Sequence, residues 1–266
     1  MTTLAPATAA AGVVPTTPLV LHIPHDSTLI PPDLRHTLLL DDDALQDEVI
    51  AMTDSFTSEL FDFAQDVPRV TFPVSRLIVD PERFVDDARE PMAARGMGVI
   101  YTTTSRGTVL RGMPSADDRA MLLETYYHPH HRALTLAVTA ALGAFASCVI
   151  IDCHSFPSRA RAYELDQFAA RLDICLGTDS YHTPQWLTTV VHDAFASEGY
   201  SVSENSPYTG SMVPSAHYES DARVASIMIE INRRLYLDEV SGERLAQFEA
   251  VRASIHRAMT VIRLAT

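Results

Sequence analysis

Residues 148–155 read CVIIDCHS, an apolar and β-branched run that ends in an aspartate and a histidine. A run of this kind is typical of a strand that is covered on both faces of a sheet. Two further runs have the same form, because Leu19–Ile23 leads into His25 and Ser226–Ile229 leads into Glu230. Ligands of open α/β sheets bind beyond the carboxyl ends of the strands. We therefore expect the polar ends of these three strands to share one crevice.

Short apolar runs alternate along the chain with longer segments of helical period, which indicates an α/β fold. The predicted strands are Leu19–Ile23, Arg69–Phe72, Arg76–Val79, Val99–Thr102, Cys148–Asp152, Ile174–Gly177 and Val224–Ile231. The predicted helices are Leu45–Ala64, Ala116–Phe145, Gln185–Ser197 and Ser241–Ile262. Three irregular stretches, residues 81–98, 103–115 and 203–221, are predicted to be long loops, and loops of this length are usually functional.

The charge of the chain narrows the classes of function that are open to it. Its 266 residues contain 20 basic and 34 acidic side chains, a formal net charge of −14. This balance argues against nucleic acid or an anionic membrane as a partner, because both favour a basic protein. All 20 of these basic side chains are arginine, and the chain contains no lysine. The absence of lysine excludes Schiff-base catalysis through that residue and a P-loop lysine.

The sequence also predicts how the chain is organised and where it works. No apolar run approaches the roughly 18 residues that a membrane-spanning helix needs. Residues 1–18 are small, are interrupted by proline and lack the basic start of a secretory signal, so we expect a flexible leader. Residues 19–266 are predicted to form a single α/β domain. Three scattered cysteines favour a reducing compartment, and we expect a cytoplasmic protein.

Two histidines at strand ends are candidates for metal ligands. A hydrolytic zinc site needs two or three N or O ligands, an open position for water and a nearby carboxylate. His25 and His154 fit the first requirement, although a histidine after a strand is more often a turn or core residue. Asp152 lies two residues before His154 and points to the same side of an extended strand. There it can orient the imidazole, or else cap a turn.

Glu230 is the candidate for the carboxylate. Alternation along the strand places it on the face opposite its isoleucine neighbours. A carboxylate within so apolar a strand should have a partner, because an unpaired buried charge is costly. Two interpretations stay open: a structural ion pair with Arg233, Arg234 or Arg76, or a general base beside a bound metal.

No other catalytic motif is as well supported. The chain has no G-x-S-x-G and no G-x-G-x-x-G motif. Its densest group of histidines, His128-Pro129-His130-His131, lies within a predicted helix. We favour a proline-kinked helix with partly exposed imidazoles over a second metal site at this group.

Eight segments in the same order make the sequence similar to the N-formylglutamate amidohydrolase family. They are IPHDS at 23–27, MTDSFTSELFDFA at 52–64, SRLIVD at 75–80, YYHPHHRAL at 126–134, IDCHSFPS at 151–158, DICLGT at 173–178, NSPYTG at 205–210 and IEINRRLYLDE at 229–239. The resemblance covers most of the chain after the predicted leader. It implies a three-layer α/β fold of the zinc-carboxypeptidase (phosphorylase/hydrolase-like) type, with a mixed central sheet flanked by helices.

The resemblance also implies a zinc-dependent amidohydrolase with one Zn²⁺ ion. Its type reaction cleaves N-formylglutamate to formate and glutamate, so the expected partner is a small acidic amide and not nucleic acid or a membrane. We expect a monomer or homodimer. By position, the metal ligands are His25, Asp54 and His154, the general base is Glu230, and the substrate-binding residues are Arg76, Arg83, Asn232 and Arg233, with Arg76 as the clamp for the substrate carboxylate. His22 is an alternative to His25, because both lie at the end of one predicted strand.

The position of Asp54 depends on how the segment Leu45–Phe63 folds. One continuous helix would place the apolar residues on one face and Asp54 on the opposite, solvated side. If Thr53 or Asp54 instead caps a new helix, the carboxylate could turn into the crevice. The residues alone leave both arrangements open, and the resemblance favours the second.

One position departs from the pattern that is typical of the family. Relatives read D-x-N-R after the S-R motif, whereas this chain reads Asp80-Pro81-Glu82-Arg83. If Glu82 faces the substrate, its charge would repel a glutamate moiety. Two further functions therefore stay open: a related zinc hydrolase of a different specialised amide or lactam, and a non-catalytic homologue that binds a small ligand.

Overall fold

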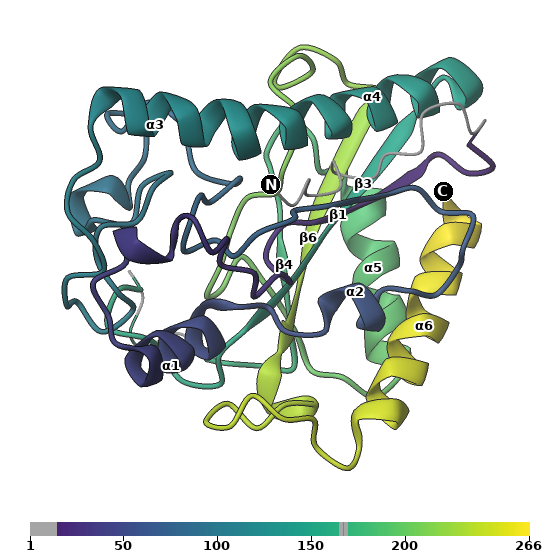
Figure 1. Ribbon diagram of the computed structural model, residues 1–266. Coiled ribbons are helices and arrows are strands. Elements are labelled where there is room, and N and C mark those ends of the chain that lie inside the picture. The colour runs from purple at the N-terminus through teal and green to yellow at the C-terminus, as the bar shows by residue number, and fades with distance from the viewer. Residues whose placement is uncertain (1–14, 165–166, 168–169) are drawn as a thin grey trace.

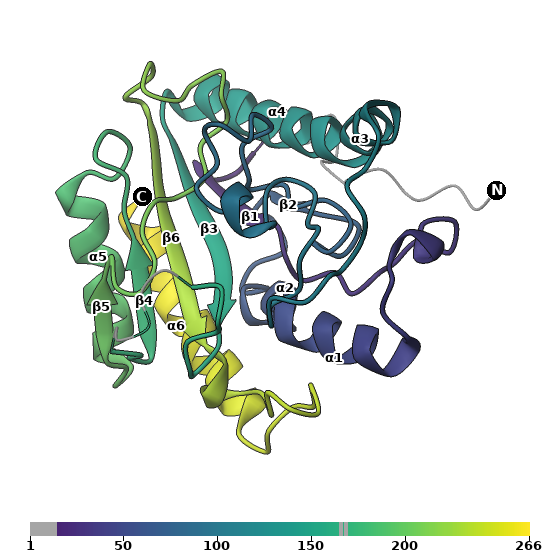
Figure 2. The same ribbon diagram turned by 90° about the vertical axis from the view of Figure 1, so that its left-hand side faces the viewer.

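The computed structural model describes residues 15–164, 167 and 170–266. Within these residues, one six-stranded sheet has the order β2-β1-β3-β6-β4-β5 (Figures 1 and 2). The strands are β1 (Leu19–Ile23), β2 (Arg69–Thr71), β3 (Cys148–Phe156), β4 (Ile174–Gly177), β5 (Val202–Glu204) and β6 (Val224–Asn232). Neighbouring strands are parallel except β4 and β6, which are antiparallel. The sheet is therefore mixed, as predicted. Most of the predicted leader, residues 1–14, lies outside the described residues.

Helices flank the sheet on both faces. They are α1 (Asp42–Met52), α2 (Thr57–Leu60), α3 (Ala116–Leu122), α4 (His128–Phe145), α5 (Gln185–Ser197) and α6 (Phe248–Ala265). A π-helical turn, Leu123–Tyr127, joins α3 to α4, and 3-10 turns lie at Arg35–Thr37, Ala93–Arg95 and Arg233–Leu235. In Figure 1, α4 runs along one side of the sheet, and α5 and α6 lie on the other. In the described part of the chain, no helix has the length and apolarity needed to cross a bilayer.

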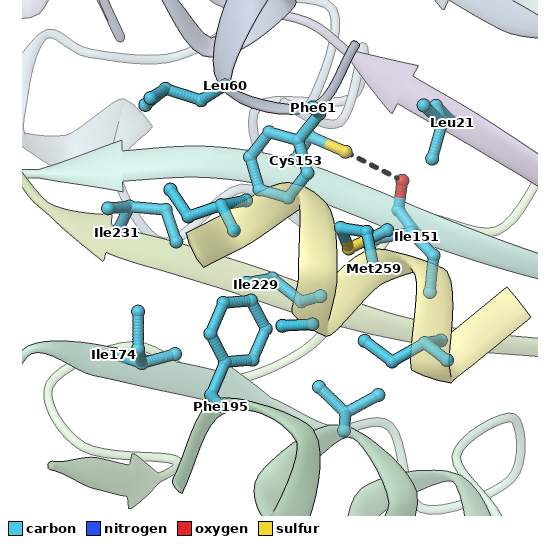
Figure 3. Close-up of a cluster of buried hydrophobic side chains, with 14 of the residues drawn as sticks. Leu21, Leu60, Phe61, Ile151, Cys153, Ile174, Phe195, Ile229, Ile231 and Met259 are labelled. Atoms are coloured by element: carbon cyan, nitrogen blue, oxygen red, sulfur yellow. Dashed lines mark hydrogen bonds between the residues drawn. The ribbon is translucent and has the colours of Figure 1, made fainter. Parts of the chain in front are cut away.

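Alternation along the strands determines which residues enter the core. Every second residue of β1, β3 and β6 faces α5 and α6, and Figure 3 shows several of them packed together. Among these are Ile151, Cys153, Ile229 and Ile231. The residues between them point to the opposite face, because successive side chains of a strand alternate. On that face α4 covers the amino-terminal half of the strands.

Strand register then brings polar residues of this second face together. His22 of β1 pairs with Asp152 of β3, and His154 of β3 pairs with Glu230 of β6. Side chains of directly paired residues are neighbours on the same face of a sheet. Polar side chains from three adjacent strands therefore lie side by side, as expected from the strand ends in the sequence.

The structure differs from the predicted elements mainly between residues 53 and 101. The predicted helix Leu45–Ala64 is divided into α1 and α2, and Phe56 at the division has a left-handed backbone with φ 68°. Arg76–Val79 and Val99–Thr102 are not strands but buried loop segments, whose apolar residues form a second core with α1 and α3. Their apolar composition reflects burial, and composition alone does not distinguish a buried loop from a buried strand.

Other predicted elements differ from the observed ones at their ends. β3 extends beyond the predicted Asp152 to Phe156, and α6 begins at Phe248 instead of Ser241. β5 is a short edge strand that overlaps the start of the predicted loop 203–221. Short edge strands carry little sequence signal, because neither face needs to be apolar.

Candidate metal centre

Three candidate ligand atoms converge beyond the carboxyl end of β1. His25 Nδ1 lies 3.3 Å from His154 Nδ1. Asp54 Oδ2 lies 3.0 Å from His154 Nδ1 and 3.6 Å from His25 Nδ1. All three side chains are buried. The structure thus brings together the three residues that the resemblance gave as metal ligands.

Local backbone contacts hold these ligands in place. His25 follows β1, and its carbonyl accepts the backbone N–H of Asp54 at 2.9 Å. Asp54 lies between α1 and α2, where its own carbonyl accepts the N–H and the hydroxyl of Thr57 at 3.2 and 2.9 Å. Of the two arrangements open for residues 45–63, the structure has the interrupted one, although the N-cap of α2 is Phe56 and not Thr53 or Asp54. The Asp54 carboxylate consequently faces the two imidazoles.

Carboxylates behind the two imidazole rings orient them. His25 Nε2 lies 2.9 Å from Asp80 Oδ1, and His154 Nε2 lies 3.1 Å from Asp152 Oδ1. When each Nε2 carries the proton for its contact, each Nδ1 presents a lone pair. Two lone pairs and a carboxylate then face one another, which is repulsive unless a cation lies between them. The donor set therefore fits a metal ion, and carboxylates are common behind metal-bound imidazoles.

The pKa shifts of this cluster have identifiable causes. Burial disfavours a charged His154, but the neighbouring Glu82 and Asp152 hold the pKa of that imidazole well above its usual range. Burial acts to raise the pKa of Asp54, but hydrogen bonds from His154 and His25 hold it well below the usual range. Without a metal, the cluster thus favours a proton between the imidazoles and the carboxylate. A metal ion would replace that proton.

Glu230 lies beside the ligands and is 7% exposed. Its Oε2 is buried and has no hydrogen-bond partner among the described residues. Arg233, Arg234 and Arg76 pair with other carboxylates. In the described part of the chain Glu230 therefore lacks the structural ion pair that the sequence left open.

The unpaired carboxyl of Glu230 has a shifted pKa. Burial raises the pKa to about 8, and the charges of Asp54 and Glu82 act in the same direction. His154 and Arg233 oppose the rise. A carboxyl group that exchanges its proton near neutral pH is suited to general acid–base catalysis.

The predicted substrate residues at the end of β6 have protein partners in the structure. Arg233 is buried and donates from Nη2 to Asp54 Oδ1 at 2.7 Å. Asn232 donates from Nδ2 to the Leu172 carbonyl at 2.9 Å and accepts the backbone N–H of Arg234 at 3.2 Å. Arg233 thus orients a candidate ligand, and Asn232 stabilises the turn after β6. Contact of either residue with substrate stays a prediction.

The other two predicted substrate residues lie around Asp80. Arg76 donates from Nε and Nη2 to Asp80 Oδ2 at 3.2 and 2.6 Å, and its Nε also contacts the Tyr101 hydroxyl at 3.1 Å. Arg83 is paired loosely, 3.6 Å from Asp80 and 3.9 Å from Glu90. The buried Nε of Arg83 has no hydrogen-bond partner in the part of the chain that the structure describes.

Two carboxylates beside the imidazoles were not among the predicted site residues. Asp80 orients His25, as described above. Glu82 Oε1 lies 3.2 Å from His154 Nε2, and its Oε2 lies 3.7 Å from His25 Nδ1. For Glu82 the sequence signals were its place in the irregular stretch 81–98 and its departure from the D-x-N-R pattern of relatives, whereas Asp80 lies just before that stretch.

His22, the alternative to His25, lies behind the converging atoms. Its Nδ1 is 2.7 Å from Asp152 Oδ1, and its Nε2 is 2.8 Å from His130 Nε2. His130 lies in the first turn of α4 and is buried, whereas His128 and His131 are partly exposed, as we expected for the imidazoles of the segment 128–131. The contact with His22 explains why His130 is inside the protein.

Comparison with known proteins supports the resemblance seen in the sequence. A model of the N-formylglutamate amidohydrolase family matches residues 17–237. The chain belongs to this family. Family membership makes the protein an amidohydrolase. No curated protein sequence matches the chain.

Solved structures show the same fold. The crystal structure of N-formylglutamate amidohydrolase from Ralstonia eutropha JMP134 matches with a TM-score of 0.79 and 24% sequence identity, over 94% of this chain and 93% of that chain. A gene product from Agrobacterium tumefaciens matches with a TM-score of 0.61 and 20% identity, over 93% of this chain and 92% of that chain. The predicted α/β fold of the amidohydrolase family is confirmed.

Proposed function

We propose that the protein hydrolyses the amide bond of a small N-acyl amino acid, with N-formylglutamate as the type substrate, by means of one zinc ion. The convergence of His25 Nδ1, His154 Nδ1 and Asp54 Oδ2 beside the unpaired Glu230 is the observation that supports this proposal. Zinc prefers such N and O ligands, and three protein ligands leave a fourth position open. A zinc ion held there would lower the pKa of a bound water molecule and polarise the amide carbonyl.

Glu230 would move the proton during the reaction. Its Oε2 has no other partner among the described residues, so it can accept the proton of the attacking water. The same oxygen can return the proton to the leaving nitrogen as the C–N bond breaks. Asp80 and Asp152 would keep the imidazole rings oriented throughout, because each accepts a ring N–H.

The carboxylate of the substrate would bind at the arginines of residues 76–83. Arg76 is only partly buried, and Arg83 has a buried Nε without a described partner. A guanidinium group binds a carboxylate through two parallel hydrogen bonds. Such a clamp would fix the amide carbonyl beside the ligand atoms, which lowers the entropic cost of the reaction.

Removal of the metal is expected to reduce formate release from N-formylglutamate to the uncatalysed background. Chelator-treated protein and protein reloaded with Zn²⁺ would be assayed for formate, with zinc counted by elemental analysis. Reloading should restore activity, because the ligands are positioned by protein contacts that do not need the ion. Full activity in zinc-free protein would contradict the zinc mechanism. A zinc-loaded protein that binds N-acyl amino acids without cleaving any would favour the non-catalytic alternative.

Hydrolysis of a different small amide or lactam is a second candidate function, and Glu82 favours it. This carboxylate contacts His154 and lies close to His25, so its charge is part of the candidate site. A negative group there opposes an acidic substrate side chain by like-charge repulsion.

Glu82→Asn is expected to increase the preference for N-formylglutamate over neutral N-formyl amino acids about tenfold, which corresponds to about 1.4 kcal/mol. The variant removes a negative charge and restores the amide that is typical of relatives. The ratio of kcat/KM for N-formylglutamate and N-formylglutamine measures the effect, and Glu243→Gln, at an exposed glutamate, is the control. An unchanged ratio would show that Glu82 does not face the substrate.

Location and assembly stay predictions from the sequence. We propose a cytoplasmic monomer or homodimer whose partner is a small acidic amide, built as a single domain over residues 19–266. Cys148, Cys153 and Cys175 are free and buried, which agrees with a reducing compartment.

A further inference from the structure

A second group of possible ligand atoms lies directly behind the first. His22 Nδ1 is 2.7 Å from Asp152 Oδ1 and 3.6 Å from Glu82 Oε1. The ligand atoms of His22, Asp152 and Glu82 all lie within 4.8 Å of one another, and His25, Glu82 and His154 satisfy the same limit. Glu82 therefore belongs to both groups.

We propose that His22, Asp152 and Glu82 bind a second divalent cation, next to the ion of the proposed hydrolytic site, and that Glu82 lies between the two. One imidazole nitrogen and two carboxylates form a mixed N/O donor set that suits Zn²⁺ and similar divalent ions. The carboxylate of Glu82 is placed for a bridging role, because its Oε1 faces His22 and its Oε2 faces His25.

The balance of charge supports a second cation. Asp54 is paired with Arg233, and Asp80 is paired with Arg76. Among the described residues, the charged partners of Asp152 and Glu82 are all imidazoles, and neither carboxylate is paired with an arginine. Buried carboxylates need a compensating charge or a metal ion. The two carboxylates of the second group thus lack the guanidinium partner that the other two have.

Further contacts fix the ligands as a metal site requires. His22 Nε2 lies 2.8 Å from His130 Nε2, so it can donate its proton there and direct the Nδ1 lone pair toward Asp152 and Glu82. Asp152 Oδ2 accepts the backbone N–H of Met212 at 2.9 Å. Metal-bound imidazoles generally donate their other N–H to a neighbouring group in this way. His130 belongs to the histidine run of α4, where we did not expect a metal site. It thus contacts a ligand of the proposed second ion without itself binding that ion.

Counting bound zinc tests the proposal. Metal-free wild-type protein would be titrated with Zn²⁺ by calorimetry, and the bound metal counted after gel filtration. We expect two equivalents in the wild type and one in Glu82→Asn and His22→Ala. Loss of a hydrogen-bond partner behind a ligand typically lowers metal affinity roughly 10- to 100-fold. Loss of a ligand itself should lower the affinity for the second ion by more than this. His128→Ala, at a partly exposed histidine of α4, should keep two equivalents.

The possible outcomes separate this proposal from the proposed function. One equivalent in the wild type, lost in His154→Ala, would overturn the second site and leave the hydrolytic site intact. Two equivalents in both Glu82→Asn and His22→Ala would also overturn it. No bound zinc in the wild type would contradict both proposals. If the fully buried His22 does not tolerate substitution, the partly exposed Glu82 decides the outcome.

Discussion

Glu230→Gln is expected to lower kcat about 10²- to 10⁴-fold while zinc content stays at the wild-type level. The amide has nearly the shape of the carboxylate but cannot accept a proton from water. Glu230 Oε2 has no hydrogen-bond partner among the described residues, so the substitution breaks no described contact of that atom. Steady-state formate release and elemental analysis of the same preparation measure the two quantities.

The pH dependence of the variant gives a second test. Burial raises the pKa of Glu230 to about 8 in the metal-free protein. A cation at the ligand atoms favours the ionised carboxylate and lowers this value. Because the base acts when ionised, wild-type kcat/KM should rise with pH along a limb below pH 8. This limb should be absent in Glu230→Gln.

The same shift has a consequence for the stability of metal-free protein. The folded-state pKa of about 8 lies above the ordinary 4.5, so protonated Glu230 contributes stability that is complete below pH 4.5. That contribution is lost as the pH rises toward 8. Urea denaturation of the chelated proteins should therefore show wild type losing stability relative to Glu230→Gln over this range.

Glu243→Gln is the matched control for the kinetic test, because Glu243 is exposed and outside the site. It should retain wild-type turnover and zinc. Turnover of Glu230→Gln close to that of the wild type would remove Glu230 as the general base, whatever the metal content.

The polar ends of β1, β3 and β6 could be predicted from the sequence because two simple rules act together there. Apolar, β-branched runs identify buried strands, and alternation along each strand determines which face a polar residue takes. The register between neighbouring parallel strands is then restricted, because a shift by one residue would move the apolar side chains out of the core. His154 and Glu230 consequently meet across β3 and β6, as expected.

The loop side of the site could not be predicted in the same way. The apolar period of residues 45–63 continues through the break between α1 and α2, where the backbone is extended at Thr53 and left-handed at Phe56. A local break of this kind depends on tertiary contacts and not on local propensity. The same holds for Asp80 and Glu82, whose positions depend on how a buried loop packs against α1 and α3.

His154→Ala is expected to lose the zinc ion of the proposed hydrolytic site and to release formate at the uncatalysed rate. The imidazole contacts Asp54 through Nδ1 and Asp152 through Nε2, so its removal takes away a ligand and its orienting contact. Loss of an outer partner alone weakens metal binding roughly 10- to 100-fold, and loss of a ligand should exceed this. Zinc bound after dialysis, counted per folded protein, measures the effect.

Folding has to be measured together with metal content, because the substitution also leaves buried carboxylates without their imidazole partner. Breaking a buried charge pair costs about 3–5 kcal/mol, so the thermal midpoint of His154→Ala should fall. His154→Gln keeps a hydrogen-bond donor for the carboxylates and should fold better, yet it should still lose zinc. His192→Ala, at an exposed histidine of α5, should change neither quantity. Full zinc occupancy in folded His154→Gln and His154→Ala would exclude His154 from the ligand set, and the proposed hydrolytic site would then lose its central residue.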